Sequence, residues 1–182
     1  VIAGRIGAET DLDVLLEPRL SNIPPPNVLA DIEPALARLI QAITNREPIG
    51  ILTDYDADGL TSHAVLNHAL VRFGVSAEQI SHWIGHRLEE GYGISPLLVD
   101  RILESTTRPT LLISADCGSS DEAQIARLKA EGIDVVVTDH HRVSDTGPPA
   151  SAFAVVNPNR ADCAYPDKAI AGCMVSWLVM SA

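Results

Sequence analysis

The stretch Ile49-Gly-Ile-Leu-Thr-Asp-Tyr-Asp-Ala-Asp-Gly59 decides the fold, because a short uncharged run passes directly into three acidic residues and a glycine. Its first five residues are typical of a buried strand. The segment 60–73 that follows repeats apolar residues at helical spacing. The sequence therefore predicts a strand, an acidic turn and a helix, in that order.

The same alternation continues toward the C-terminus. We expect further strands at 79–84, 110–115, 133–138 and 153–156, with helices at 96–104 and 120–130. Strands that are apolar throughout and separated by helices are typical of a parallel sheet that is covered on both faces. The predicted fold class is therefore α/β, with a mostly parallel five-stranded sheet and helices on both faces.

Residues 1–47 are predicted to form a helical N-terminal lead-in to a domain at 48–182. This lead-in contains a short helical segment at 11–16, a stiff break at Pro24–Pro26 and an amphipathic helix through 28–43. The chain begins at Val1, and its last segment, 168–182, is apolar on all sides with no stop signal. We therefore expect the chain to be an excerpt of a longer protein, truncated at its C-terminal end.

Composition limits the classes of partner. The chain has 182 residues, 46% of them hydrophobic, and a formal net charge of −11 at pH 7. It is therefore neither a disordered chain nor a general binder of polyanions, and a nucleic-acid role would need a metal, a local basic groove or another domain. Three cysteines at unrelated positions favour the reducing cytoplasm, and the longest apolar run is too short to suggest a membrane partner.

Acidic, histidine and amide side chains follow four of the predicted strands, where ligands bind in open α/β sheets. They are Asp54, Asp56 and Asp58, then Asp116, then Asp139-His140-His141, then Asn157. If the first segment stays extended, its three carboxylates point to one side and need protons or a cation. A solvated acidic loop is the alternative. An EF-hand is excluded, because Val65 occupies the position where that calcium loop needs a glutamate.

The histidine pair suggests which cation. Adjacent side chains project differently, so at most one of His140 and His141 would bind a metal and the other could face a substrate. Carboxylate and imidazole ligands suit manganese or magnesium, whereas zinc is disfavoured because the cysteines lack ligand spacing. Asp116 could instead cap the following helix, as Ser119 could. The remaining histidines at 63, 68, 82 and 86 are interpreted as ordinary surface or core residues.

The segment Arg87-Leu-Glu-Glu-Gly-Tyr-Gly93 follows the second predicted strand. Its arginine, Gly91 and Gly93 could hold an anionic oxygen, although a neighbouring glutamate could pair with the arginine instead. Thr61 or Ser62 is expected to cap the helix after Gly59. Together these groups predict metal-assisted phosphoester hydrolysis, with two cations about 3.5–4 Å apart.

These motifs, in this order and spacing, resemble the DHH phosphoesterase superfamily, and within it the RecJ branch of single-stranded-DNA-specific 5′-to-3′ exonucleases. The resemblance runs from about residue 49 to residue 172. Its motifs are Asp54-Tyr-Asp-Ala-Asp-Gly59, Arg87-x-x-Glu90-Gly-Tyr-Gly93, Asp116-Cys-Gly118, Asp139-His-His141, Asn157-Pro158 and Asp162-Cys-x-Tyr-Pro166. It implies an enzyme of DNA repair and recombination whose partners are single-stranded DNA and replication or repair proteins such as single-strand-binding protein or a helicase.

The resemblance also implies roles for individual residues. Manganese or magnesium would be held by four of them: Asp56, Asp58, Asp116 and His140. Asp54 would be an outer ligand, Asp139 would orient the histidine, and His141 would face the scissile phosphate; these three form the expected catalytic group. Arg87 would contact DNA phosphate. We place Gly91, Gly93 and Asn157 with it as substrate-binding residues.

The chain departs from the family pattern at Gly85, where proline is usual, and at Gly172-Cys-Met-Val175. The superfamily also supplies another metal-binding aspartate and a substrate-binding domain beyond Ala182, so we expect an incomplete metal site and weak activity in this fragment. Alternative functions are a DHH phosphodiesterase of short oligonucleotides or cyclic dinucleotides, or a non-catalytic replication-scaffold relative. A nucleotide-binding module without hydrolysis is disfavoured, because the chain has no G-x-x-x-x-G-K-[ST] loop.

Overall fold

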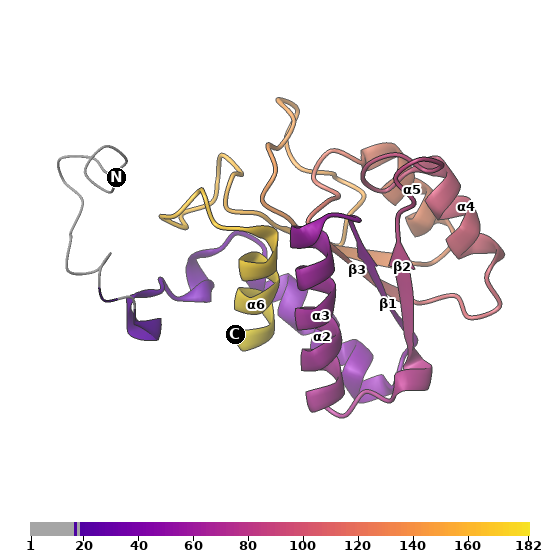
Figure 1. Cartoon of the computed structure of the whole chain (residues 1–182), viewed down its shortest axis with the longest axis horizontal. Helices are drawn as coiled ribbons and strands as arrows, with labels where there is room; N and C mark the ends of the chain where they lie inside the picture. Colours follow the sequence, from indigo (N-terminus) through magenta and orange to yellow (C-terminus); the bar gives the residue numbers. More distant parts are fainter. Residues whose placement is uncertain (1–16, 18) are drawn as a thin grey trace.

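The computed structural model of the chain describes residue 17 and residues 19–182 (Figure 1). The helical segment predicted at 11–16 lies outside the described residues. Within the described part of the chain, no helix combines the length and the apolarity that crossing a bilayer requires.

Five parallel strands form one sheet in the order β2-β1-β3-β4-β5. Their bounds are β1 Ile49–Thr53, β2 Ile80–Ile84, β3 Leu111–Ala115, β4 Asp134–Thr138 and β5 Ala154–Val156. The helices are α2 Ile32–Asn45, α3 Ala57–Arg72, α4 Pro96–Glu104, α5 Glu122–Ala130 and α6 Gly172–Ser181. Single 3₁₀ turns lie at Leu20–Asn22, Pro26–Val28 and Ala77–Gln79. The predicted five-stranded parallel α/β fold is confirmed.

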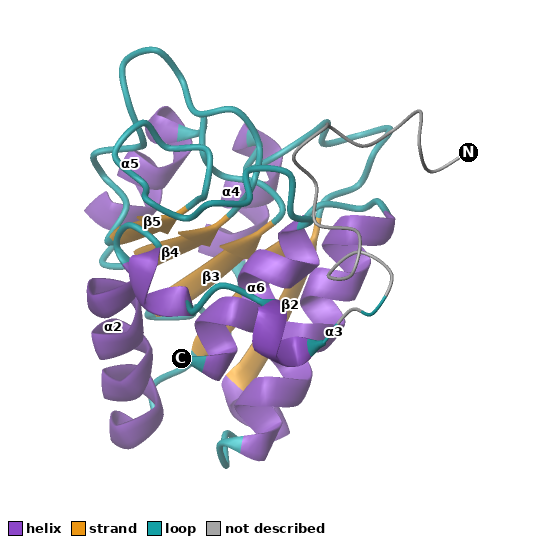
Figure 2. Ribbon diagram, turned by 90° about the vertical axis from the view of Figure 1, so that its left-hand side faces the viewer, coloured by secondary structure: helices purple, strands orange, loops and turns teal. Residues whose placement is uncertain are grey.

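Helices cover both faces of the sheet, as the apolar strands require (Figure 2). Successive side chains of a strand point to opposite faces, so Ile49 and Ile51 enter the core under α2, α3 and α6. Leu52 enters a second core with residues of α4 and α5. β1 is thereby buried on both sides, which keeps the residues that follow it in a defined position.

Helix α2 of the lead-in packs against the same core as β1. Its buried residues Ile32, Ala35 and Leu39 are among the core residues of that face. The helix begins at Ile32, four residues later than predicted, because Asp31 adopts a left-handed conformation with φ 58°. Its carboxylate accepts hydrogen bonds from the Val155 amide and from Arg160, which ties the start of α2 to β5.

Helix α3 begins earlier than predicted, and its cap is a different residue. Asp56 Oδ1 accepts hydrogen bonds from the amides of Asp58 (2.9 Å) and Gly59 (3.0 Å), so the helix starts at Ala57. The expected cap at Thr61 or Ser62 is wrong, since Thr61 lies within the helix and donates to the Ala57 carbonyl. The acidic segment does not stay extended, which was the condition for its three carboxylates to point to one side, because Asp58 lies in the helix that the Asp56 carboxylate caps.

Candidate metal centre

The carboxyl ends of three neighbouring strands bring the acidic residues together. Asp54 follows β1, Asp116 follows β3 and Asp139 follows β4, and parallel strands place these ends at one edge of the sheet. We call five residues around this edge the acid–histidine cluster: Asp54, Asp56, Asp116, His140 and His141. Ligand atoms of Asp54, Asp56 and Asp116 lie within 4.8 Å of one another, and so do those of Asp116, His140 and His141.

Asp116 belongs to both groups and is the most constrained of the five. It is 1% exposed and adopts a left-handed conformation with φ 60°. Burial, followed by the charges of Asp58 and Asp56, raises its pKa to about 8. Among the described residues its Oδ1 atom finds no hydrogen-bond donor of acceptable geometry, although His140 Nε2 lies 3.1 Å away. A second buried oxygen of this kind is Asp54 Oδ1, and burial raises the pKa of that carboxyl as well.

His140 is oriented by the backbone. Its Nδ1 atom lies 2.8 Å from the Ile170 carbonyl oxygen, which makes Nδ1 the protonated donor. The Nε2 lone pair then faces Asp116 Oδ1 at 3.1 Å and Asp58 Oδ2 at 3.5 Å. A carbonyl that fixes the tautomer in this way is common behind metal-binding histidines.

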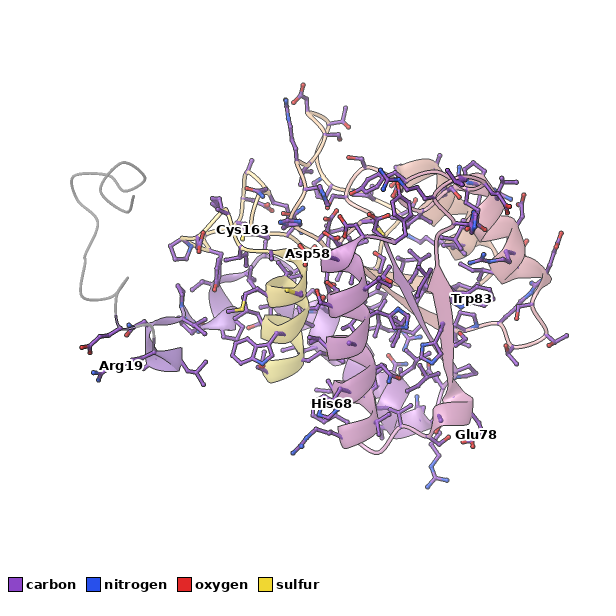
Figure 3. The ribbon with its side chains drawn as sticks, viewed as in Figure 1. Arg19, Asp58, His68, Glu78, Trp83 and Cys163 are labelled. Carbon is purple, nitrogen blue, oxygen red and sulfur yellow. The ribbon has the colours of Figure 1, made fainter. Side chains whose placement is uncertain are left out.

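Asp58 lies beside the cluster and is held by helix α6. Its Oδ2 accepts the Gly172 amide at 2.7 Å and its Oδ1 accepts the Cys173 amide at 2.8 Å. Figure 3 shows Asp58 at the end of α3 where α6 also begins. These amides are unpaired by helix geometry, so they are natural partners for a carboxylate.

Asp139 organises the two histidines. Its Oδ1 accepts hydrogen bonds from the His140 amide (2.7 Å), the His141 amide (3.1 Å) and His141 Nδ1 (2.8 Å), and its Oδ2 accepts the Ser119 amide (3.0 Å). Burial alone would raise the pKa of Asp139, but the bonds from His141 and Ser119 lower it to about 2. The same contact raises the pKa of His141, which therefore favours its cationic form.

Tyr92 is a site residue to which the sequence analysis assigned no role. Its hydroxyl lies 3.0 and 3.2 Å from the two ring nitrogens of His141 and donates to the Asp116 carbonyl at 3.4 Å. The loop that carries it is fixed by Asp121, whose Oδ2 accepts the Ile94 amide at 2.9 Å. The sequence signal that could have identified Tyr92 is its position inside the motif that begins at Arg87.

Arg87 lies exposed with its guanidinium 5.4 Å from the centre of the Tyr55 ring, within reach of a cation–π interaction. The alternative pairing of Arg87 with a neighbouring glutamate does not form: Glu90 pairs with Arg101 at 3.0 Å, and Glu89 Oε2 lies 3.9 Å from His86 Nδ1. Gly91 and Gly93 both have positive φ, 80° and 76°. The loop thus presents Arg87 next to Tyr55, which lies between Asp54 and Asp56 in the sequence.

Asn157 is fully buried behind the histidines. Its side-chain amide donates to Ser119 Oγ at 2.7 Å and to the His141 carbonyl at 2.9 Å. In this conformation Asn157 therefore holds the backbone of His141. Ser119, considered only as a helix cap from the sequence, joins Asn157 to Asp139.

The donor set fits a divalent cation. Two buried carboxylate oxygens in the described part of the chain have no hydrogen bond, and an imidazole lone pair faces one of them. Oxygen donors with a single imidazole suit manganese or magnesium better than softer ions. Fold and site together define a parallel α/β domain with a carboxylate–imidazole cluster at the carboxyl edge of its sheet.

The chain belongs to the DHH family: the family described as "DHH family, N-terminal domain" matches residues 48–181. It is 38% identical over 167 residues to the single-stranded-DNA-specific exonuclease RecJ of Haemophilus influenzae, covering 92% of this chain and 28% of that protein. It is 37% identical over 143 residues to RecJ of Thermus thermophilus, covering 79% of this chain and 20% of that protein. The chain thus spans between a fifth and a third of the length of these relatives.

Solved structures agree with these relatives. A crystal structure of exonuclease RecJ bound to manganese matches with a TM-score of 0.72 and 34% identity, over 84% of this chain and 37% of that chain. A crystal structure of RecJ from Thermus thermophilus in complex with Mn²⁺ matches with a TM-score of 0.69 and 29% identity, over 91% of this chain and 22% of that chain. The resemblance inferred from the motifs is confirmed.

Proposed function

We propose that this protein hydrolyses phosphodiester bonds of single-stranded DNA from the 5′ end, with manganese or magnesium as its cofactor. The observation that carries the proposal is Asp116, a buried carboxylate shared by two groups of ligand atoms. A carboxylate that belongs to two groups of possible ligand atoms fits a site for two neighbouring cations. The relatives named as single-stranded-DNA-specific exonucleases support the substrate class.

The proposed ligands are Asp56, Asp58, Asp116 and His140, with Asp54 beside them. We keep Asp58 in this set because its Oδ2 atom lies 3.5 Å from His140 Nε2, although the first turn of α6 also donates a hydrogen bond to its carboxylate. When bound, the cations supply charge that stabilises the phosphate oxygens and makes water more acidic. The positive charge of the cations would also relieve the repulsion between the carboxylates of the acid–histidine cluster.

The side chains around the cluster have separate tasks. We assign Arg87 to the phosphate of the strand, because it is exposed and positioned over Tyr55. Asp54, whose pKa is raised by burial, accepts the proton that the attacking water releases. As the new P–O bond forms and the old one breaks, His141, whose cationic form Asp139 favours, donates a proton to the leaving oxygen. Asn157 and Tyr92 hold His141 in place.

Cellular role and partners follow from the same proposal. We propose a part in DNA repair and recombination in the cytoplasm, together with single-strand-binding protein or a helicase. The three cysteines at 117, 163 and 173 are free thiols, which is compatible with a reducing compartment. Because the net charge is −11, strand affinity would need bound cations, a local basic groove or another domain.

That charge also supports a second candidate, a phosphodiesterase of short oligonucleotides or cyclic dinucleotides. A short substrate carries few phosphates, so an acidic chain repels it less than it repels a long strand. Preference for chain length separates the two candidates. Faster turnover of dinucleotides than of long single strands would support the phosphodiesterase.

The test is a manganese titration of full-length protein with long single strands labelled at the 5′ or the 3′ end, with duplexes and with dinucleotides. We expect manganese-dependent release from the 5′ end of single strands, and near inactivity of the 182 residues alone. Asp116→Ala and His140→Ala should abolish cleavage while circular dichroism stays native. His68→Ala, which removes an exposed histidine of α3, is the control. Turnover at the wild-type rate in either cluster variant refutes the proposal.

A further inference from the structure

Two histidines outside the acid–histidine cluster meet on the face of the sheet that carries α3. His82 of β2 is opposite Ile51 of β1 in the parallel register, and His63 lies on α3, which covers β1. His63 Nε2 and His82 Nδ1 are 2.8 Å apart, and the ring centres are 5.0 Å apart at an interplanar angle of 37°. Both residues come from regular elements, so their backbones are rigidly placed.

A buried hydroxyl orients the first of these rings. Thr53, which is 1% exposed at the end of β1, has its Oγ1 atom 3.1 Å from His63 Nδ1. When Nδ1 donates to this hydroxyl, the lone pair of Nε2 is directed toward His82. This is the way a neighbouring polar group sets the tautomer of a metal-binding histidine.

His63 is ready to bind a metal at neutral pH. Burial, followed by the nearby ring of His82, lowers the pKa of His63 to about 4. His63 is therefore uncharged at neutral pH and has no proton to lose before binding a metal. His82 is exposed, so an ion can reach the pair from solvent.

We propose that His63 and His82 together bind a divalent transition-metal ion, with water completing its coordination. Bonds of about 2.0–2.1 Å from two imidazoles to one ion need nitrogens about 3–3.4 Å apart. The observed 2.8 Å requires the pair to open by about half an ångström, which the exposed ring of His82 can do by rotating about its side-chain bonds.

The imidazole donors of the pair favour one class of ion, and the pair is a site separate from the acid–histidine cluster. Imidazole nitrogens favour zinc, nickel and copper, whereas magnesium and calcium need oxygen donors. Among the described residues, neither histidine belongs to the groups of ligand atoms around Asp116. The inference is therefore independent of the proposed nuclease function.

The test uses Ni²⁺ and the 182-residue chain carrying His140→Ala and His141→Ala, which removes the imidazoles of the cluster. Calorimetry measures affinity, and NMR of the imidazole protons identifies the rings that Ni²⁺ broadens. His82→Gln and Thr53→Val are added separately to this background. His68→Gln is the matched control, because His68 is exposed on the same helix (Figure 3). Thermal melts followed by circular dichroism establish that each variant is folded.

We expect Ni²⁺ to broaden the His63 and His82 resonances, and His82→Gln to remove this broadening. Thr53→Val should weaken binding roughly tenfold or more, as loss of an orienting partner does at other metal sites. His68→Gln should change nothing. Absence of Ni²⁺ binding in the starting background, or equal affinity with and without His82→Gln, overturns the proposal and leaves a histidine pair joined by a hydrogen bond.

Discussion

Asp58 Oδ2 accepts a hydrogen bond of 2.7 Å from the Gly172 amide, which joins the first turn of α3 to the first turn of α6 across 114 residues of sequence. The same glycine faces Asp116, because a Cβ atom at position 172 would lie 2.7 Å from Asp116 Oδ1. The start of α6 thus forms one wall of the acid–histidine cluster. A glycine is needed there because a side chain would occupy the space of the shared carboxylate.

Gly172→Ala should therefore damage both the stability and the metal site. The added methyl group meets the Asp116 carboxylate, and such overpacking costs about 1–3 kcal/mol of unfolding free energy. Denaturant unfolding and manganese calorimetry measure the two effects. Gly85→Ala is the control, because the nearest atoms to its Cβ are 3.8 Å away. If Gly172→Ala binds manganese with unchanged affinity, α6 does not shape the site.

Asp116→Asn should stabilise the metal-free protein while it removes metal binding. With a pKa of about 8, the folded state holds a proton that the unfolded carboxyl releases near its ordinary 3.8. The contribution of Asp116 to stability should therefore fall as the pH rises from about 4 to about 8, since its carboxyl binds fewer protons in the unfolded state. Asp116→Asn does not lose stability in this way, because its side chain has no carboxyl group to titrate. Each 1 kcal/mol regained raises the melting temperature by about 2–4 °C.

Thermal melts of the two proteins at about pH 5 and about pH 8, with and without manganese, test this reasoning. Manganese should raise the melting temperature of the wild type alone. If manganese stabilises Asp116→Asn equally, Asp116 is not a ligand.

Asp121 should control the position of Tyr92 at His141. Asp121→Ala removes the acceptor of the Ile94 amide, so the loop that carries Tyr92 loses its anchor. Asp121→Asn keeps a carbonyl oxygen there and should retain most of the function. We expect nuclease turnover of the full-length protein to drop about tenfold or more in the Ala variant and to be rescued in the Asn variant.

The pH profile of turnover is the second measurement for the Asp121 variants. Displacement of Tyr92 changes the surroundings of His141, which the pH profile reports. A loss of turnover that is equal in Asp121→Ala and Asp121→Asn would point to the charge of Asp121, and not to its bond with Ile94.

His63 should make the protein less stable in mild acid. Its pKa is about 4 in the folded state against an ordinary 6.5, so the unfolded state takes up a proton first as the pH falls. The contribution of His63 to stability is therefore complete above about pH 6.5 and declines toward about pH 4, by about 2 kcal/mol after allowance for solvent screening. Urea unfolding of the wild type and of His63→Gln measures the decline. The variant should lose less stability than either the wild type or His68→Gln; equal losses in all three exclude His63 as the cause.

Local patterns were sufficient for the elements whose signals lie within a few residues. β1 and α4 have the bounds predicted for 49–53 and 96–104, because an uncharged run defines the first, and Ser95 with Pro96 begins the second. The start of α3 was misplaced because Gly59 was interpreted as a turn before the helix, whereas Asp56 caps the helix. The convergence of Asp54, Asp116 and Asp139 was also predictable, since parallel strands share one carboxyl edge.

By itself, the sequence determined the parallel α/β fold, the DHH motifs and the edge at which their acids meet, because these depend on residue type and periodicity along the chain. Only the tertiary structure decided that α6 holds Asp58, that Tyr92 reaches His141 and that His63 meets His82. Each of these contacts joins residues from separate elements. Its geometry depends on strand order, register and the packing of helices on the sheet, which no local pattern encodes.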